Sequence, residues 1–286
     1  MDQAARLREL LSRPGLLLAP GCYDGMSARL VQRAGYEVAY MTGFGSAASV
    51  LGMPDTGLIS FAEMATHAGN LAAAIDIPLI ADADTGYGNA VNAYRTVRAY
   101  ARAGVAAVQI EDQVSPKKCG HTKGKLVVPL PEMVGKIRAA CDARAEQDIV
   151  LIARTDARAV NGFADALERS LAFVEAGADV VFFEAPESVE EMRTVARTVK
   201  APTLINVVQD GKTPCLHADE LERLGFKIAI YPAMLFRIAA LAMKEELARF
   251  QREKQYTPGD TRMRFAEIQD IVGFPWYYEL EEKYRA

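Results

Sequence analysis

The sequence predicts a (β/α)8 barrel, the TIM-barrel fold of the α/β class, on three observations. Eight short apolar runs alternate with longer helical patterns as far as about residue 240. Each run is almost continuously apolar, as expected of a parallel strand that is buried on both faces. Helix end, glycine and buried strand recur as a quasi-repeat, in RAGYEVAYMTG, RAGVAAVQIED, EAGADVVFFEA and RLGFKIAIYPA. Eight such units in about 230 residues match the size of this barrel.

The elements follow one another along the chain. The first residues, MDQAARLRELLSRPG, pattern as an amphipathic helix that ends at Pro14-Gly15. The expected strands are the runs that begin at Leu16, Val38, Pro78, Ala106, Ile149, Asp179, Pro202 and Lys227. Glycine fits before several of them because helices commonly close with a left-handed residue. An open doubly wound sheet is the competing arrangement, but no G-x-G-x-x-G follows the first strand.

A long helix, AMLFRIAALAMKEELARFQREKQ, and an aromatic tail follow the eighth strand. We expect one domain over residues 1–286, with the barrel at about 16–245 and a helical extension at about 246–286. The tail contains the only tryptophan, Trp276, beside Pro275 and two tyrosines. Such aromatics need a surface that buries them, which is either the chain's own barrel or, as we favour, another subunit.

Composition excludes several classes of protein. A net charge of -4 over 286 residues argues against nucleic acid as the main partner, which would require a basic face. No apolar run approaches the roughly 20 residues of a membrane span, and the start lacks a signal peptide's apolar core. The four cysteines are scattered without CxxC spacing, so we expect the reducing cytoplasm. Only three histidines are present, which disfavours a zinc site.

Polar and charged side chains stand where six of the expected strands end. Catalytic groups of such barrels lie at the carboxyl ends of the strands, so these residues are the candidate site. They are Thr42-Gly43-Phe44, Asp82 with Asp84, Glu111-Asp112, Arg154, Glu184 and Asn206.

The acidic residues among them predict a metal ion. Asp82 and Asp84 point to the same side of one strand by its period of two, and Glu111 and Asp112 come from the next strand. Carboxylates gathered around one point repel each other unless a cation lies between them. Oxygen ligands without histidine or thiolate favour Mg²⁺ or Mn²⁺. The alternative is that the acids cap helices or pair with Arg154 and Arg158.

The lysine-rich stretch SPKKCGHTKGK, residues 115–125, reads as a loop on the same face. Cys119 and His121 have no second ligand pair for zinc, and no aromatics accompany the lysines as a nucleic-acid site would require. What remains is a thiol beside Lys117, Lys118 and His121, where positive charge stabilises a thiolate. Cys119 is therefore a candidate nucleophile or proton donor.

Taken together, these motifs resemble those of the isocitrate lyase/phosphoenolpyruvate mutase superfamily. KKCGH at 117–121 looks like the signature of its lyase branch, and ADADTGYG at 81–88 looks like its metal strand. Five further motifs also occur in the order that the family has: MTGFGSAASVLGMPDTG, IEDQV, IARTDA, FFEAP and INVV. The resemblance covers about residues 16–240 and, more weakly, the tail.

The resemblance implies a barrel that exchanges helices between subunits, usually in homotetramers, with Mg²⁺ (or Mn²⁺) held by Asp82, Asp84 and Glu111. Cys119 would be the general acid on a gating loop, tuned by Lys117 and His121. Arg154 would stabilise a developing oxyanion. The residues expected around the substrate and the metal-bound waters are Thr42, Gly43, Phe44, Asp55, Gly120, Glu184, Asn206 and Pro232.

The activity implied is an Mg²⁺-dependent carbon–carbon lyase. It would cleave a 2-hydroxy di- or tricarboxylate, of the 2,3-dimethylmalate or 2-methylisocitrate type, by retro-aldol chemistry. The products would be pyruvate or glyoxylate and a carboxylate such as propionate or succinate. Bulky Phe44 favours the dicarboxylate, because methylisocitrate lyases commonly have a small residue there.

Three alternatives stay open. Oxaloacetate hydrolysis or decarboxylation is disfavoured by Pro232, which stands where the hydrolases have a serine. Phosphonate chemistry of the phosphoenolpyruvate mutase type is disfavoured by the KKCGH loop. A non-catalytic, metabolite-binding barrel would have no reason to keep the acids, Cys119 and Arg154 together.

Overall fold

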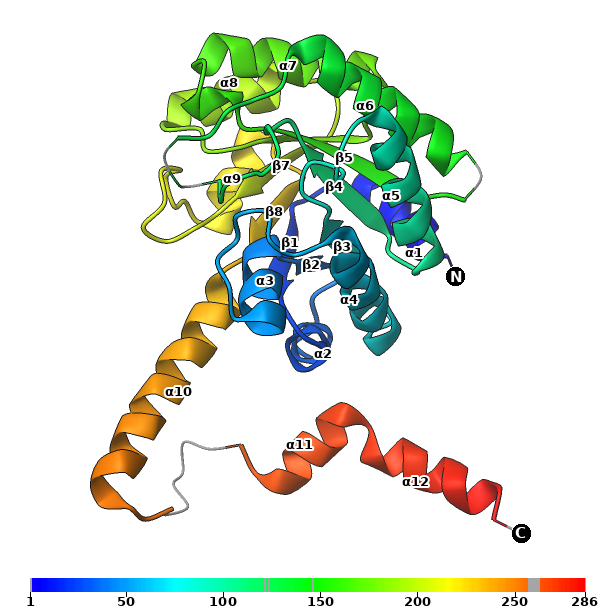
Figure 1. The fold of residues 1–286 in the computed structure, drawn as a ribbon, viewed down its shortest axis with the longest axis vertical. Coiled ribbons are helices and arrows are strands. Elements are labelled where there is room, and N and C mark those ends of the chain that lie inside the picture. Colours follow the sequence, from blue (N-terminus) through cyan, green and yellow to red (C-terminus); the bar gives the residue numbers. More distant parts are fainter. Residues whose placement is uncertain (1, 121, 123, 146, 257–262, 286) are drawn as a thin grey trace.

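The structure, a computed structural model, describes residues 2–120, 122, 124–145, 147–256 and 263–285. Eight parallel strands form a closed barrel in sequence order, with β8 paired to β1, so the predicted fold is confirmed (Figure 1). The strands are β1 (Leu17–Cys22), β2 (Ala39–Met41), β3 (Leu79–Asp82), β4 (Ala107–Glu111), β5 (Val150–Thr155), β6 (Val180–Phe183), β7 (Thr203–Asn206) and β8 (Ile228–Tyr231). Each of these lies within one of the predicted runs or extends past its end by a few residues.

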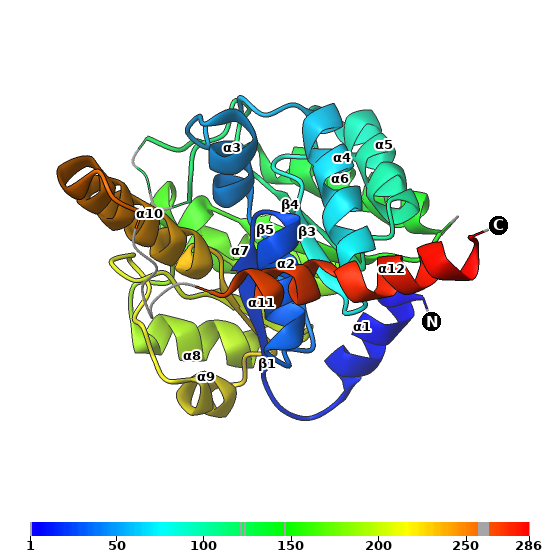
Figure 2. The ribbon, with the colours of Figure 1, turned by 90° about the horizontal axis from the view of Figure 1, so that it is seen from below.

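Helices surround the barrel (Figures 1 and 2). They are α1 (Gln3–Ser12), α2 (Gly25–Arg33), α3 (Gly43–Leu51), α4 (Phe61–Ala74), α5 (Ala90–Arg102), α6 (Leu130–Arg144), the 3₁₀ turn η1 (Ala157–Ala159), α7 (Phe163–Glu175), α8 (Val189–Thr198), α9 (Ala218–Leu224), α10 (Met234–Glu253), α11 (Phe265–Val272) and α12 (Phe274–Lys283). The amphipathic helix expected at the start of the chain is α1, which ends before Pro14 as predicted.

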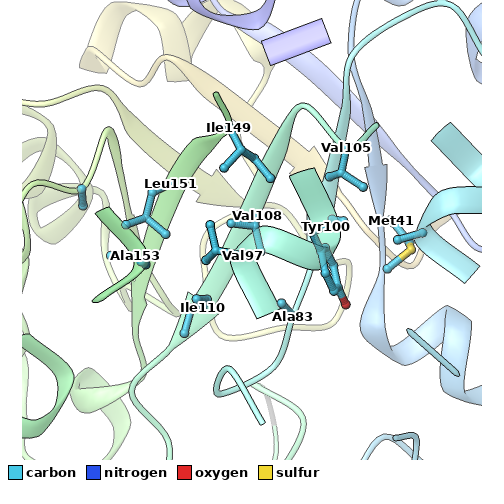
Figure 3. Packing of buried hydrophobic residues seen from close by; sticks show 14 of the residues in the cluster. Met41, Ala83, Val97, Tyr100, Val105, Val108, Ile110, Ile149, Leu151 and Ala153 are labelled. Atoms are coloured by element: carbon cyan, nitrogen blue, oxygen red, sulfur yellow. The ribbon is translucent and has the colours of Figure 1, made fainter. Parts of the chain in front are cut away.

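The core has two layers because alternate strand residues point to opposite faces. Figure 3 shows the outer layer, where Val97 and Tyr100 of α5 pack against Val108 of β4 and Leu151 of β5. These side chains are buried, with exposed fractions of at most 1%. The outer layer therefore attaches the helices to the barrel.

The inner layer fills the barrel and directs the site residues to one end of it. Ile80, Ile152 and Phe182 point inward and pack with Leu7 and Leu10 of α1, which closes the amino-terminal end. Two residues further along β3, β5 and β6, on the same inward face, come Asp82, Arg154 and Glu184. The inward-facing Asp82, Arg154 and Glu184 therefore meet at the carboxyl end of the barrel.

The C-terminal extension makes few contacts with the barrel. In Figure 1, α10 projects away from it, and none of the helix's residues is buried. α11 lies against α2, where Arg33 pairs with Asp270 and Ile271 is 3% exposed (Figure 2). Trp276 of α12 is 57% exposed. Within the described residues, no helix has both the length and the apolar character needed to cross a membrane.

Candidate active site

A cavity of about 400 Å³ opens at the carboxyl end of the barrel, and it brings together most of the predicted site residues. Those that line it are Thr42, Gly43, Phe44, Asp55, Asp82, Lys117, Cys119, Gly120, Arg154, Glu184, Asn206 and Pro232. Asp84 and Glu111 are buried behind this lining, where they contact Lys117 and Arg154. His121 lies outside the described residues.

Asp55, Asp82, Asp84 and Glu111 form an acidic cluster with Lys117 among them. The Lys117 Nζ atom lies 2.5 Å from Asp55 Oδ1 and 3.0 Å from Asp84 Oδ1. The lysine side chain is 5% exposed although its residue belongs to the loop between β4 and α6. The sequence placed Lys117 beside Cys119 as a tuning group, and the resemblance placed Asp55 near the substrate and the metal-bound waters. The structure adds a direct contact between this lysine and two members of the acidic cluster.

Burial raises the pKa of three carboxyls of the acidic cluster, those of Asp82, Asp84 and Glu111. It raises the pKa of Asp84 from its ordinary 3.8 to about 6, although Lys117 opposes the shift. Burial also raises the pKa of Asp82, and raises that of Glu111 well above its usual range. For Lys117, burial lowers the pKa, but the surrounding carboxylates outweigh it and raise the pKa well above normal. Burial therefore disfavours the ionised form of Asp82, Asp84 and Glu111, and a cation bound beside them would favour it.

The chemistry of the acidic cluster fits a hard divalent cation. Asp55 Oδ1 and Asp84 Oδ1 are buried, and among the described residues each forms an ion pair with the Lys117 ammonium. As the described side chains lie, no three of Asp, Glu, His or Cys converge closely enough to enclose a metal ion. Mg²⁺ usually takes one or two carboxylates and keeps several waters, so it does not need such an enclosure.

Arg154 is a second buried cation at the cavity, in contact with Glu111 of the acidic cluster. Its Nε atom lies 2.8 Å from Asp156 Oδ2 and 3.3 Å from Glu111 Oε2, and its Nη2 atom lies 3.8 Å from Glu184 Oε1. The guanidinium carbon is also 4.9 Å from the centre of the Phe182 ring. The carboxylates hold the pKa of Arg154 well above its ordinary value even though burial opposes this. Arg154 is therefore a fixed positive charge.

The start of α3 offers backbone N–H groups to the cavity. Thr42 caps this helix, with its side chain accepting from the Gly45 N–H, and the first turn presents donors suited to a carboxylate. Gly43 is required for space, because a Cβ atom there would lie 2.6 Å from Asp82 Oδ2. Phe44 is 39% exposed and meets Phe236 of α10 edge to face at 5.6 Å.

The loop between β4 and α6 lies closed over the cavity. Gln113 donates to the Lys118 carbonyl at 2.8 Å and accepts from the Lys118 N–H at 3.0 Å. A Cβ atom on Gly120 would lie 2.4 Å from both Arg154 Nη2 and Glu184 Oε1, so the loop backbone rests directly on that pair. Cys119 is partly buried and lines the cavity between these two contacts.

Asp112 turns away from the acidic cluster, as its position on the opposite face of β4 requires. It accepts hydrogen bonds from Thr155 Oγ1 at 2.8 Å and from Arg169 Nη1 at 3.2 Å. Asp112 therefore pairs with an arginine, but with Arg169 in place of the expected Arg154 or Arg158. Burial raises the pKa of Asp112 to about 6.

Sequence reasoning missed several cavity residues. Tyr40 lines the floor and donates from its hydroxyl to Gln109 Oε1 at 2.9 Å. Arg237 of α10 lines the rim and binds Asp210 Oδ2 at 2.9 Å. Tyr40 and Gln109 stand on inward-facing strand positions, so the period of two could have found them. Arg237 lies on a helix whose pattern gave no such signal.

Comparison with known proteins gives a family and near relatives. The family described as phosphoenolpyruvate phosphomutase matches residues 7–251. A 2,3-dimethylmalate lyase from Eubacterium barkeri is 48% identical, with 99% of each chain covered. A 2-methylisocitrate lyase from Aeropyrum pernix is 45% identical over 97% of this chain and 88% of its own length.

Solved structures agree with the sequence matches. A 2,3-dimethylmalate lyase structure superposes with a TM-score of 0.94 at 39% identity, covering 99% of this chain and 95% of that one. An oxaloacetate acetylhydrolase bound to 3,3-difluorooxalacetate gives a TM-score of 0.95 at 35% identity, covering 99% and 97%. The fold alone therefore does not separate cleavage from hydrolysis.

Proposed function

The chain belongs to the phosphoenolpyruvate mutase/isocitrate lyase superfamily, as its motifs predicted, and from this premise we propose that it is a carbon–carbon lyase acting on a 2-hydroxy dicarboxylate of the 2,3-dimethylmalate type. One observation carries the proposal: Cys119 lines the same cavity as Arg154 and as Asp55 and Asp82 of the acidic cluster. This arrangement supplies a proton donor, a fixed cation and oxygen ligands around one small molecule.

Two groups of cavity residues would bind and orient the substrate: the start of α3, and the pair Glu184 and Asn206. The N–H groups at the start of α3, at Gly43 and Phe44, would receive the carboxylate that becomes part of the 2-oxo acid. Glu184 and Asn206 would hold the second half of the substrate through polar contacts. The cavity wall formed by Ile230 and Pro232 is apolar and suits a methyl-substituted carbon chain.

Bond cleavage follows from these positions. As the substrate hydroxyl loses its proton, the C2–C3 bond breaks, C2 becomes the carbonyl of the 2-oxo acid, and the electron pair moves to C3 and its carboxylate. Arg154 would stabilise the oxygen on which negative charge develops, and Cys119 would protonate the carbon left at C3. Loop closure would keep water from this carbanion.

Asp82, Asp84 and Glu111 would hold a divalent cation, Mg²⁺ or Mn²⁺, with Asp55 next to its waters. When bound, such an ion polarises the hydroxyl and carbonyl oxygen of the substrate as a Lewis acid. The burial of Asp82, Asp84 and Glu111 supports this assignment, because it raises the pKa of each carboxyl and a bound cation would favour the ionised form.

The preference for a dicarboxylate rests on the cavity rim. Arg237, the cation at the rim that could bind a third carboxylate, is paired with Asp210 at 2.9 Å and bonded to the Gln209 carbonyl at 3.0 Å. The Phe44 side chain also lines the cavity and narrows the space for a third carboxylate. A 2-methylisocitrate-type tricarboxylate is the second candidate, favoured by the 45% identical relative.

A substrate panel tests the proposal. The protein with Mg²⁺ is incubated with 2,3-dimethylmalate, 2-methylisocitrate, isocitrate and oxaloacetate, and released 2-oxo acid is trapped with phenylhydrazine. We expect the fastest release from 2,3-dimethylmalate and a loss of turnover in Cys119→Ser. Cys141→Ser on α6, whose thiol contacts the Gly177 carbonyl far from the cavity, is the matched control. Oxalate formation from oxaloacetate without cleavage of the other substrates would favour the hydrolase instead.

We also propose a homo-oligomer, a homotetramer by family expectation, in which α10 packs on a neighbouring subunit. The support is its exposed apolar side chains, among them Ile238, Leu241 and Leu247, which are 62%, 55% and 68% exposed. Light scattering after gel filtration measures the mass, and Leu241→Glu should reduce it. We propose a reducing compartment, the cytoplasm, because all four cysteines are free thiols.

A further inference from the structure

Lys125 is a buried cation that the proposed reaction does not use. Its side chain is 1% exposed although the residue stands near the end of the loop between β4 and α6. The Nζ atom lies 2.5 Å from Asp156 Oδ1 and donates to the Gly120 carbonyl at 2.5 Å. One ammonium group therefore joins a fixed carboxylate at the end of β5 to the backbone of the loop.

Asp156 connects this contact to Arg154. Its two carboxylate oxygens accept from Arg154 Nε at 2.8 Å and from Nη2 at 3.1 Å, while Oδ1 also receives Lys125. Burial would raise the pKa of Asp156, but the two cations outweigh it and hold the pKa below its ordinary value. Asp156 is thus ionised and shared between the guanidinium at the cavity and the ammonium under the loop.

The loop is fixed on both sides of Cys119. Before it, Gln113 binds both backbone groups of Lys118, and after it, Lys125 binds the carbonyl of Gly120. The Gly120 backbone also rests on Arg154 and Glu184, with no room for a Cβ atom. An apolar residue would fill the space under the loop without the cost of burying a charge, so the ammonium points to a positional role.

We propose that Lys125 is a positioning residue: through Asp156 and the Gly120 carbonyl it holds the loop closed and sets the Cys119 thiol over the cavity. The link through Asp156 makes this closure depend on Arg154 being in place. The inference rests on the proposed function for its catalytic consequence, but the position of the thiol can be measured without any substrate.

Thiol reactivity gives the direct test. The full-length protein, without substrate, is treated with iodoacetamide, and peptide mass spectrometry gives the labelling rate of Cys119 relative to exposed Cys215. In Lys125→Met we expect this ratio to rise about tenfold, because the loop opens more often. Lys118→Met removes the same charge from the same loop, but its ammonium contacts only the Gly124 carbonyl among the described residues. Its ratio should stay at the wild-type value.

A second variant and a kinetic measurement complete the experiment. Lys125→Gln keeps a donor without the charge and should give an intermediate ratio; it also carries the test if Lys125→Met does not fold. With a substrate that is turned over, kcat of Lys125→Met should fall about 10²-fold while KM changes little, since no substrate contact is removed. An unchanged Cys119 ratio in a folded Lys125 variant overturns the inference. A raised ratio in a protein that cleaves none of the substrates leaves the inference standing and overturns the proposed function.

Discussion

Replacing Gly120 with alanine tests whether the loop must rest on Arg154 and Glu184. The added Cβ atom would lie 2.4 Å from Arg154 Nη2 and 2.4 Å from Glu184 Oε1. Ordinary van der Waals separation is about 3.5 Å, so each contact is about 1 Å too short. Both side chains are buried and held by other partners, at exposed fractions of 7% and 1%. The loop, rather than the barrel, must therefore move outward.

The magnitude follows from that displacement. A misplacement of about 1 Å from the reactive geometry costs roughly 10²-fold in rate, or about 2.7 kcal/mol of activation free energy. The free energy of unfolding should change by less than about 0.5 kcal/mol, because the loop can retreat into solvent. Gly135→Ala is the matched control. It lies within α6 with no atom within 4 Å of the added Cβ, so it should leave kcat/KM unchanged and stabilise the helix by about 0.5–1 kcal/mol.

The assay is kcat/KM for 2-oxo acid release, measured beside urea denaturation for both variants. Full kcat/KM in Gly120→Ala would refute the reasoning, because the loop would then not need to touch the Arg154–Glu184 pair. A large loss of stability in Gly120→Ala would also refute the reasoning, because it would show that the barrel side chains move instead of the loop.

Three further outcomes follow from the acidic cluster. Lys117→Met should destabilise the metal-free protein by about 3 kcal/mol at pH 8, because it leaves the carboxylates of Asp55 and Asp84 buried without their cation; urea denaturation measures this, and saturating Mg²⁺ should restore much of the loss. Gly43→Ala should weaken Mg²⁺ binding about 10–100-fold in calorimetric titrations, because its Cβ would lie 2.6 Å from Asp82 Oδ2; unchanged affinity would argue against Asp82 as a ligand. Asp84, with a pKa of about 6 in place of 3.8, makes its contribution to metal-free stability below about pH 3.8 and loses it as the pH rises through about 6. Mg²⁺ binding should accordingly release protons near pH 6 and weaken below it, which calorimetry in buffers of different ionisation enthalpy detects.

The barrel could be predicted because its physics is local. Strands buried on both faces must be apolar along their whole length, and a glycine that ends several of the preceding helices marks where the strands begin. Asp82, Arg154 and Glu184 stand at inward-facing positions near the carboxyl ends of their strands, so the sequence alone predicts that they share one site. Membership of the superfamily, predicted from the same motifs, is confirmed by the family match.

The contacts of the loop could not be predicted in this way. Lysines in a glycine-containing loop read as solvent-exposed, and Lys118 behaves so. Lys117 and Lys125 are instead drawn inside by Asp55, Asp84 and Asp156, which lie far from them in the sequence. No periodicity reports such a pairing, because it depends on where the barrel brings its strand ends.

Leu7 and Leu10 of helix α1 fill the amino-terminal end of the barrel. In the described part of the chain, the cavity therefore opens at the carboxyl end. A molecule that enters there also departs there, past the same loop. Cleavage makes two fragments from one substrate, and both must use that exit in turn. The fragment nearer the loop departs first, and the deeper one, still bound when the exit reopens, competes directly with the next substrate. Product inhibition patterns therefore report which fragment lies deeper.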